Sequence, residues 1–157
     1  MCVCAKCEKK TPHNRLPVRL SAEGEYLQPM KCKKCGYAWE MPVVEWIYSR
    51  VGQDVKFKPP AQRKGKLKDR AVVKSDNSSD GTPYWDVVDL IQFDDPERPD
   101  WIRMSYYLRD RNGMLTFGGQ TSIAEPIAVW RKVLVDVARQ KQWFCNLLKD
   151  VVHKLGE

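Results

Sequence analysis

Two short stretches, Cys4-Ala-Lys-Cys7 and Cys32-Lys-Lys-Cys35, decide the organisation of this 157-residue chain. A tight turn within each Cys-x-x-Cys pair aims both thiolates at one point, so two facing turns supply four sulfur ligands in a tetrahedral arrangement. Gly36 follows the second pair and suits a ligand turn that needs a positive φ. The four cysteines therefore predict one structural metal ion, with zinc as the expected metal.

Other uses of these cysteines lead to different expectations. A disulfide framework would need an oxidising compartment, and the residues after Met1 do not form a charged and then apolar leader. A redox-active pair would be expected near a βαβ pattern, which follows neither pair. Iron also accepts four thiolates, but Glu8 stands where a rubredoxin has a glycine after its first pair. We therefore expect a zinc site in a reducing, cytoplasmic compartment.

The segment 2–41 resembles a zinc ribbon, in which two cysteine turns sit on a small three-stranded sheet. Residues Arg15–Leu20, Glu25–Lys31 and Tyr37–Met41 have the pattern of its strands, with a turn-forming break at Ser21–Gly24. The resemblance implies a fold and a metal that supplies most of the module's folding energy. Zinc ribbons serve both nucleic acids and proteins, so the resemblance alone does not assign a function.

The positive charge of the chain is concentrated in one segment. The net charge is +7, and between Lys56 and Lys74 eight basic residues face one acid, Asp69. This segment also contains Pro59-Pro60, so we interpret it as an extended basic arm or linker outside the packed core. Such an arm would gain affinity for phosphates by releasing counterions. The residues expected to bind nucleic acid are Lys33, Lys34, Lys56, Lys58, Arg63, Lys64, Lys66, Lys68, Arg70 and Lys74.

Further candidates for that interface lie on the ribbon. Arg15 and Arg19 would add charge, and Tyr37 or Trp39 could stack on bases.

The C-terminal half has the pattern of three strands and a helix. Tyr84–Phe93 and Trp101–Arg109 alternate like strands, with Ile102, Met104, Tyr106 and Leu108 expected on the core face of the second. Asn112-Gly113 predicts a hairpin turn before a third strand over Met114–Thr121. Ser122–Glu125 has the form of a helix cap. An apolar stripe then runs from Ile127 to Leu155, interrupted by Lys141, as one long helix or two with a bend at 140–142. The stripe suits either a sheet-packed face or a dimerising coiled coil, and we expect the sheet-packed face and a monomer.

These patterns together predict an α+β protein. The expected order is a zinc ribbon over 1–41, then 42–83 with a short helix or strand and the basic arm, then a β-β-β-α module over 84–157. In that module a three-stranded antiparallel meander would be packed by a long C-terminal helix. Topologically the order resembles a double-stranded-RNA-binding domain, but the long arm departs from that family.

The expected function is non-enzymatic binding to nucleic acid or to a nucleoprotein assembly. The alternative is a protein-interaction adaptor that docks through the ribbon face and the aromatic C-terminal helix. Enzyme motifs for phosphate cradling or nucleophilic catalysis are missing from the sequence, and it contains two histidines. A remote alternative is a Mg²⁺-dependent nuclease that uses the acids Asp86, Asp89, Asp94, Asp95, Glu97 and Asp100.

Overall fold

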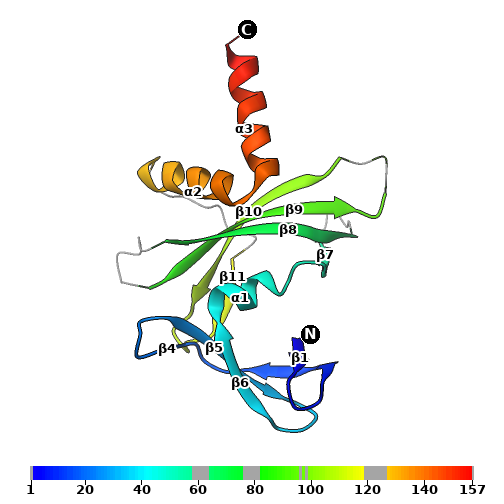
Figure 1. The fold of residues 1–157 in the computed structure, drawn as a ribbon, viewed down its shortest axis with the longest axis vertical. Helices are drawn as coiled ribbons and strands as arrows, with labels where there is room; N and C mark the ends of the chain where they lie inside the picture. Colours follow the sequence, from blue (N-terminus) through cyan, green and yellow to red (C-terminus); the bar gives the residue numbers. More distant parts are fainter. Residues whose placement is uncertain are drawn as a thin grey trace.

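A computed structural model describes residues 2–57, 64–75, 82–95, 97, 99–118 and 127–156. Its architecture is mixed α+β, with a five-stranded sheet in the middle of the molecule. Figure 1 shows helices α2 and α3 on one side of this sheet, and helix α1 with the N-terminal strands on the other. The predictions for Lys58, Arg63 and the Ser122–Glu125 cap concern positions outside the described residues.

The N-terminal part is built from six short strands. Strands β1 (Cys2–Cys4) and β2 (Lys9–Thr11) form an antiparallel hairpin. In a second sheet the central strand β5 (Tyr26–Cys32) pairs with β3 (His13–Arg15), β4 (Arg19–Leu20) and β6 (Ala38–Pro42). The three extended segments that the ribbon pattern predicts are thus present, with the first divided into β3 and β4. Helix α1 (Val43–Tyr48) follows β6 directly and confirms the short helix rather than a further strand.

The main sheet is antiparallel and has the order β11-β10-β9-β8-β7. Its strands are β7 (Asp54–Lys56), β8 (Lys64–Ser75), β9 (Tyr84–Phe93), β10 (Trp101–Arg109) and β11 (Leu115–Phe117). The turn between β10 and β11 uses Gly113 at a φ of 77°, as the Asn112-Gly113 pair predicts. Asp110 Oδ1 accepts hydrogen bonds from the backbone of Asn112 and Met114, which fixes that turn.

The prediction of an unpacked basic arm is wrong for Lys64–Ser75. This segment is β8, which pairs with β9 over ten residue pairs and lies inside the five-stranded sheet. Leu67 is buried between exposed lysines on either side of it, and the consecutive residues Ala71, Val72 and Val73 are all buried. A strand covered on both faces has this run of apolar residues, and the charged positions around it obscured the pattern.

The prediction of which side chains of β10 face the core is also wrong. Ile102 and Met104 are exposed, whereas Ser105 and Tyr107 on the opposite face are buried. The opposite face lies against α1 and the N-terminal strands, where Tyr107 packs with Trp46. The helix pair on the other side is packed on Ala71, Val73 and Val88, in β8 and β9, so Ile102 and Met104 remain exposed.

The C-terminal stripe forms two helices with a break at 140–142, which confirms that alternative over one long helix. Helix α2 (Ile127–Gln140) ends and α3 (Gln142–Leu155) begins at Lys141, whose φ of −132° and ψ of 110° are extended. The buried residues of α2 are Val129, Val133 and Val137. Trp130 and Leu134 from the predicted stripe are only partly buried. Helix α3 points away from the sheet (Figure 1) and leaves Val152 and Leu155 exposed.

One core cluster joins the N-terminal strands to the main sheet. Val18 and Met30 pack in the same cluster as Trp46 of α1 and Trp85 and Val87 of β9. This contact fixes the position of the cysteine-bearing strands over one face of the sheet.

Candidate metal centre and basic surfaces

The four predicted cysteines converge. Their sulfur atoms lie within 4.8 Å of one another, with 3.7 Å between Cys4 and Cys35 and 4.0 Å between Cys7 and Cys32. A tetrahedral ion with Zn–S bonds of about 2.3 Å has sulfur–sulfur edges of about 3.8 Å. The cluster therefore has the size of a tetrathiolate metal site in a zinc-ribbon-like arrangement. The four cysteines of the cluster and Cys145 carry free thiols.

Both cysteine turns are closed by the same type of backbone hydrogen bond. In the first, the N–H groups of Cys7 and Glu8 donate to the carbonyl of Cys4, and in the second the N–H of Gly36 donates to the carbonyl of Cys32. The residue after each pair has a positive φ, 53° at Glu8 and 71° at Gly36. Gly36 adopts this conformation freely, whereas Glu8 adopts it against the preference of an L-residue.

Two of these thiols have pKa values that are shifted in opposite directions. The Thr11 hydroxyl, 3.3 Å from Cys32 Sγ, together with backbone N–H groups of the second turn, lowers the pKa of Cys32 to about 6. The pKa of Cys7 is raised to about 12, first by its hydrogen bond to Cys35 and then by burial. Only thiolates bind metal, so loading the site would release protons and would depend on pH.

Other candidate metal ligands lie elsewhere. His13 packs edge-on against Trp39 at 4.9 Å and is not a member of the cysteine cluster. Cys145 belongs to α3. Within the described ranges, the acids predicted for a nuclease do not gather into a group that could hold a metal, and Asp89 is fully buried in ion pairs with arginines.

The structure places several predicted phosphate-binding lysines at the surface. Lys33 and Lys34 are exposed on the second cysteine turn. Lys56 pairs across β7 and β8 with Lys64, next to Lys66, and these three exposed lysines form a row at the sheet edge that we call the lysine row. Lys74 is also exposed. Lys68 is partly neutralised by Asp100 at 3.2 Å.

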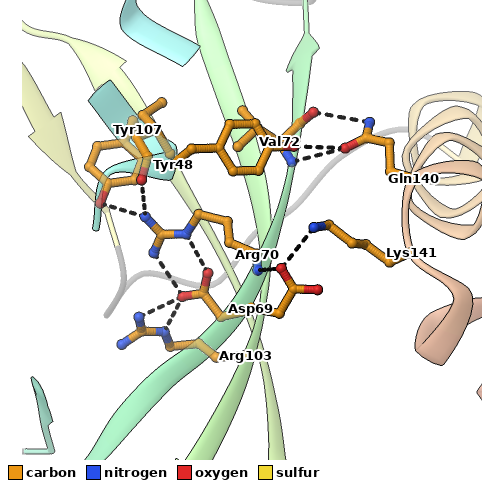
Figure 2. A network of polar contacts seen from close by, with 10 residues as sticks. Tyr48, Asp69, Arg70, Val72, Arg103, Tyr107, Gln140 and Lys141 are labelled. Carbon is orange, nitrogen blue, oxygen red and sulfur yellow. Dashed lines mark hydrogen bonds and ion pairs between the residues drawn. The ribbon is translucent and has the colours of Figure 1, made fainter. Parts of the chain in front are cut away.

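Arg70 requires a correction, because its exposure is 1%. Its Nε and Nη2 donate to the two carboxylate oxygens of Asp89, at 2.6 and 3.0 Å, and its Nη1 donates to Ile47 O and Tyr107 Oη. Figure 2 shows this guanidinium among protein partners, with Arg103 on the same carboxylate. Although burial opposes its charge, the bonds to Asp89 raise the pKa of Arg70 further. Arg70 is a buried structural cation and not a surface contact for phosphates.

The ribbon residues proposed as additional contacts have different surroundings. Arg19 forms a bidentate ion pair with Glu40, which uses part of its hydrogen-bonding capacity. Arg15 lines a cavity described below. Tyr37 is 41% exposed and its ring stacks on that of Trp39, so one face of this aromatic pair is accessible.

Sequence reasoning missed Arg50 and Arg103 as candidate site residues. They line the same cavity as Arg15 but come from distant parts of the chain, so no local motif marks them. Comparison of the chain with protein-family models, curated proteins and solved structures gave no match. In the described part of the chain, no helix is both long and apolar enough to cross a membrane.

Proposed function

We propose that this protein is a non-enzymatic nucleic-acid-binding protein whose N-terminal module is held together by one structural zinc ion. The convergence of four cysteine sulfurs is the observation that carries the metal site. Zinc is proposed because four thiolates fill a tetrahedral shell and leave no position for a substrate, as in structural zinc sites. The free thiols suit a reducing, cytoplasmic compartment.

The basic surface supports a polyanionic partner. The exposed lysines of the second cysteine turn and the lysine row provide five positive charges on two structural units. Lysines on a rigid turn and a sheet edge contact phosphates without reading base sequence, and their affinity comes from counterion release. The stacked pair Tyr37 and Trp39 would add sequence-tolerant contact with unpaired bases. Lys58 and Arg63 stay part of the proposal on sequence grounds.

A matched pair of triple variants tests this function. We expect Lys56→Gln, Lys64→Gln and Lys66→Gln together to weaken binding of single- and double-stranded oligonucleotides at all sequences and to flatten its salt dependence. The control replaces Lys132, Lys149 and Lys154, which are exposed on α2 and α3, and leaves the same net charge. Equal losses in the two triple variants would show that only net charge matters, and salt-independent binding would contradict the proposal.

The alternative function is a protein-interaction adaptor. It is favoured by one observation, the apolar side chains of Leu147, Val151, Val152 and Leu155 that α3 leaves exposed. A protein that binds no oligonucleotide, and that self-associates in sedimentation experiments unless it carries Val152→Glu and Leu155→Glu, would favour this alternative. We propose a monomer for the nucleic-acid-binding protein, because the buried positions of α2 face the sheet and not a second helix pair.

A further inference from the structure

A cavity of about 620 Å³ lies between the N-terminal strands and the main sheet. Its wall comes from β3 and β5, from α1 and the turn after it, from β7 and β8, and from the β10–β11 hairpin. It is separate from the cysteine cluster and from the side chains of the lysine row. A volume of this size is in the range of small-molecule sites.

The cavity is lined by arginines. Arg15, Arg50, Arg70 and Arg103 contribute to the wall, and among the described residues one carboxylate, that of Asp54, lines it. Guanidinium groups stay ionised at any pH that a protein tolerates. The surface of the cavity is therefore positive, and an anion would be attracted to it.

The floor of the cavity holds a charge cluster that is not neutral. Arg70 and Arg103 both donate to Asp89, whose side chain has no solvent exposure. Two guanidinium groups share this one carboxylate, so one positive charge is left over on side chains that are 2% and 20% exposed. An uncompensated buried charge is unfavourable, and an anion that binds beside it would be stabilised.

Three of the arginines have donors to spare. Within the described residues, the Nη1 group of Arg103 and the guanidinium group of Arg50 donate no hydrogen bond. Arg15 donates one N–H to the carbonyl of Leu115. The guanidinium carbons of Arg15 and Arg50 lie 5.1 and 5.6 Å from the centre of the Trp46 ring. These cation–π contacts hold both groups near one place, which lowers the entropy lost on binding a ligand.

The mouth of the cavity also offers an aromatic surface. Phe117 lines it and is 43% exposed, with its ring 5.0 Å from that of Tyr107 and with Arg103 over it at 5.1 Å. A flat, apolar group could stack on its free side. The cavity thus combines several phosphate-binding donors with one exposed aromatic ring.

We propose that this cavity, which we call the arginine cleft, binds a nucleoside monophosphate group. The phosphate would contact Arg15, Arg50 and Arg103, and the base would stack on Phe117. A phosphate monoester carries about −1.5 to −2 charge at neutral pH, which matches the excess of guanidinium groups over Asp54 and Asp89. Arg70 is a positioning residue here, because its donors hold Asp89 and Tyr107. The same chemistry exists in a free mononucleotide and in the phosphorylated end of a nucleic-acid strand.

Calorimetric titration of the metal-loaded 157-residue chain tests the arginine cleft. The ligands are adenosine 5′-monophosphate, inorganic phosphate and adenosine. We expect the mononucleotide to bind more tightly than either fragment. Arg15→Gln with Arg50→Gln should lower its affinity at least tenfold, whereas Phe117→Ala should weaken the mononucleotide and leave inorganic phosphate unchanged.

The control variant is Arg131→Gln with Arg139→Gln, two exposed arginines of α2 that carry the same charge away from the cleft. An unchanged affinity in this control supports the assignment. A wild-type protein that does not bind the mononucleotide, an equal loss in the control, or inorganic phosphate that binds as tightly as the mononucleotide would overturn it.

Two oligonucleotides of one sequence, with and without a 5′-phosphate, separate the two sources of the ligand. Preference for the phosphorylated strand, lost in the Arg15/Arg50 variant, assigns a strand end, and binding of the mononucleotide alone assigns a free nucleotide. The arginine cleft does not depend on the lysine row. Loss of oligonucleotide binding in the lysine variant with retained mononucleotide binding leaves the cleft intact, and the reverse result leaves the proposed function intact.

Discussion

The two faces of the five-stranded sheet are packed by different physical means. The face toward α2 and α3 is covered by an aliphatic and aromatic cluster that includes Val88, Val133 and Phe144. The face toward the N-terminal strands combines an apolar cluster around Trp46 and Trp85 with the buried Arg70–Asp89 pair and the arginine cleft. The helix face contributes stability through apolar burial. The face toward the N-terminal strands, which we call the ribbon face, carries buried charges beside the arginine cleft.

A third region joins the two faces. The uncovered edge of β8 beyond Lys66 receives the junction of α2 and α3 (Figure 2). The Gln140 amide bonds to both backbone groups of Val72 and accepts a hydrogen bond from Tyr48 of α1. Lys141 Nζ and Trp143 Nε1 donate to the carboxylate of Asp69 at 2.7 and 3.0 Å. These contacts end α2 at Lys141 and satisfy strand groups that would otherwise face solvent.

The largest expected difference between the faces follows loss of the metal site. We expect Cys32→Ser to remove the metal and to abolish amide hydrogen-exchange protection in β5 and α1, because a small module depends on its metal for folding energy. Protection in α2 should persist, since its contacts are to Ala71, Val73 and Val88. Cys145→Ser, which changes a cysteine outside the cluster, is the control. Equal loss of hydrogen-exchange protection in α1 and α2 would show that the two faces do not differ in their dependence on the metal.

The next effect concerns the buried charges of the ribbon face. Arg70→Met should destabilise the protein by about 3 kcal/mol, because Arg103 still pairs with Asp89 but the buried acceptors Asp89 Oδ1, Ile47 O and Tyr107 Oη lose a donor, at about 1–3 kcal/mol for each one left unsatisfied. Chemical denaturation measures this change. The double variant Arg70→Met with Asp89→Leu should recover a large part of the loss, as apolar replacement of a buried pair does. A double variant less stable than the single one would contradict this view of the pair.

The helix face should respond to loss of volume instead of loss of charge. Val133→Ala removes two methyl-sized groups from a side chain that is 3% exposed, and we expect a loss of roughly 2 kcal/mol. Val135→Ala on the same helix, at an exposed position, is the matched control and should change stability by less than about 0.5 kcal/mol. Similar losses at the two positions would mean that α2 is not packed by the Val133 side.

The smallest effect belongs to the junction at the edge of β8. Burial opposes ionisation of Asp69, but hydrogen bonds from Lys141, the Arg70 backbone and Trp143 outweigh it and lower the pKa of Asp69. A carboxylate with a lowered pKa stabilises the fold above its ordinary pKa near 4, and this contribution is lost as the pH falls through the lowered value. Asp69→Asn should therefore cost about 1 kcal/mol at pH 7 and remove part of the acid sensitivity below pH 4. Thermal melts of both proteins between pH 2 and pH 7 check this. Parallel pH profiles would show that Asp69 does not contribute.

Local patterns were sufficient for several parts of the molecule. The spacing of the four cysteines predicted their convergence, because a ligand turn is a short-range structure. The alternation of Tyr84–Phe93 and Trp101–Arg109 predicted two strands with the bounds that the structure has. Gly113 predicted its turn because few other residues adopt a positive φ.

Contacts between distant residues decided the rest. In Lys64–Ser75 the lysines suggested an arm, but pairing with β9 makes a strand of it, and Asp89 turns Arg70 into a buried cation. The covered face of β10 depends on where the N-terminal strands dock. The sequence left open one C-terminal helix or two, and the contact of Lys141 with Asp69 favours the break between two helices. The arginine cleft is assembled from six strands and a helix, so no sequence motif could show it.

The most direct test of the account is the metal content of protein purified without chelator. Elemental analysis should find one zinc ion per chain, and Cys4→Ser should abolish it while Cys145→Ser should not. A chain that folds as described but carries no zinc, or that carries iron in its place, would contradict the claim that a structural zinc site organises the ribbon face.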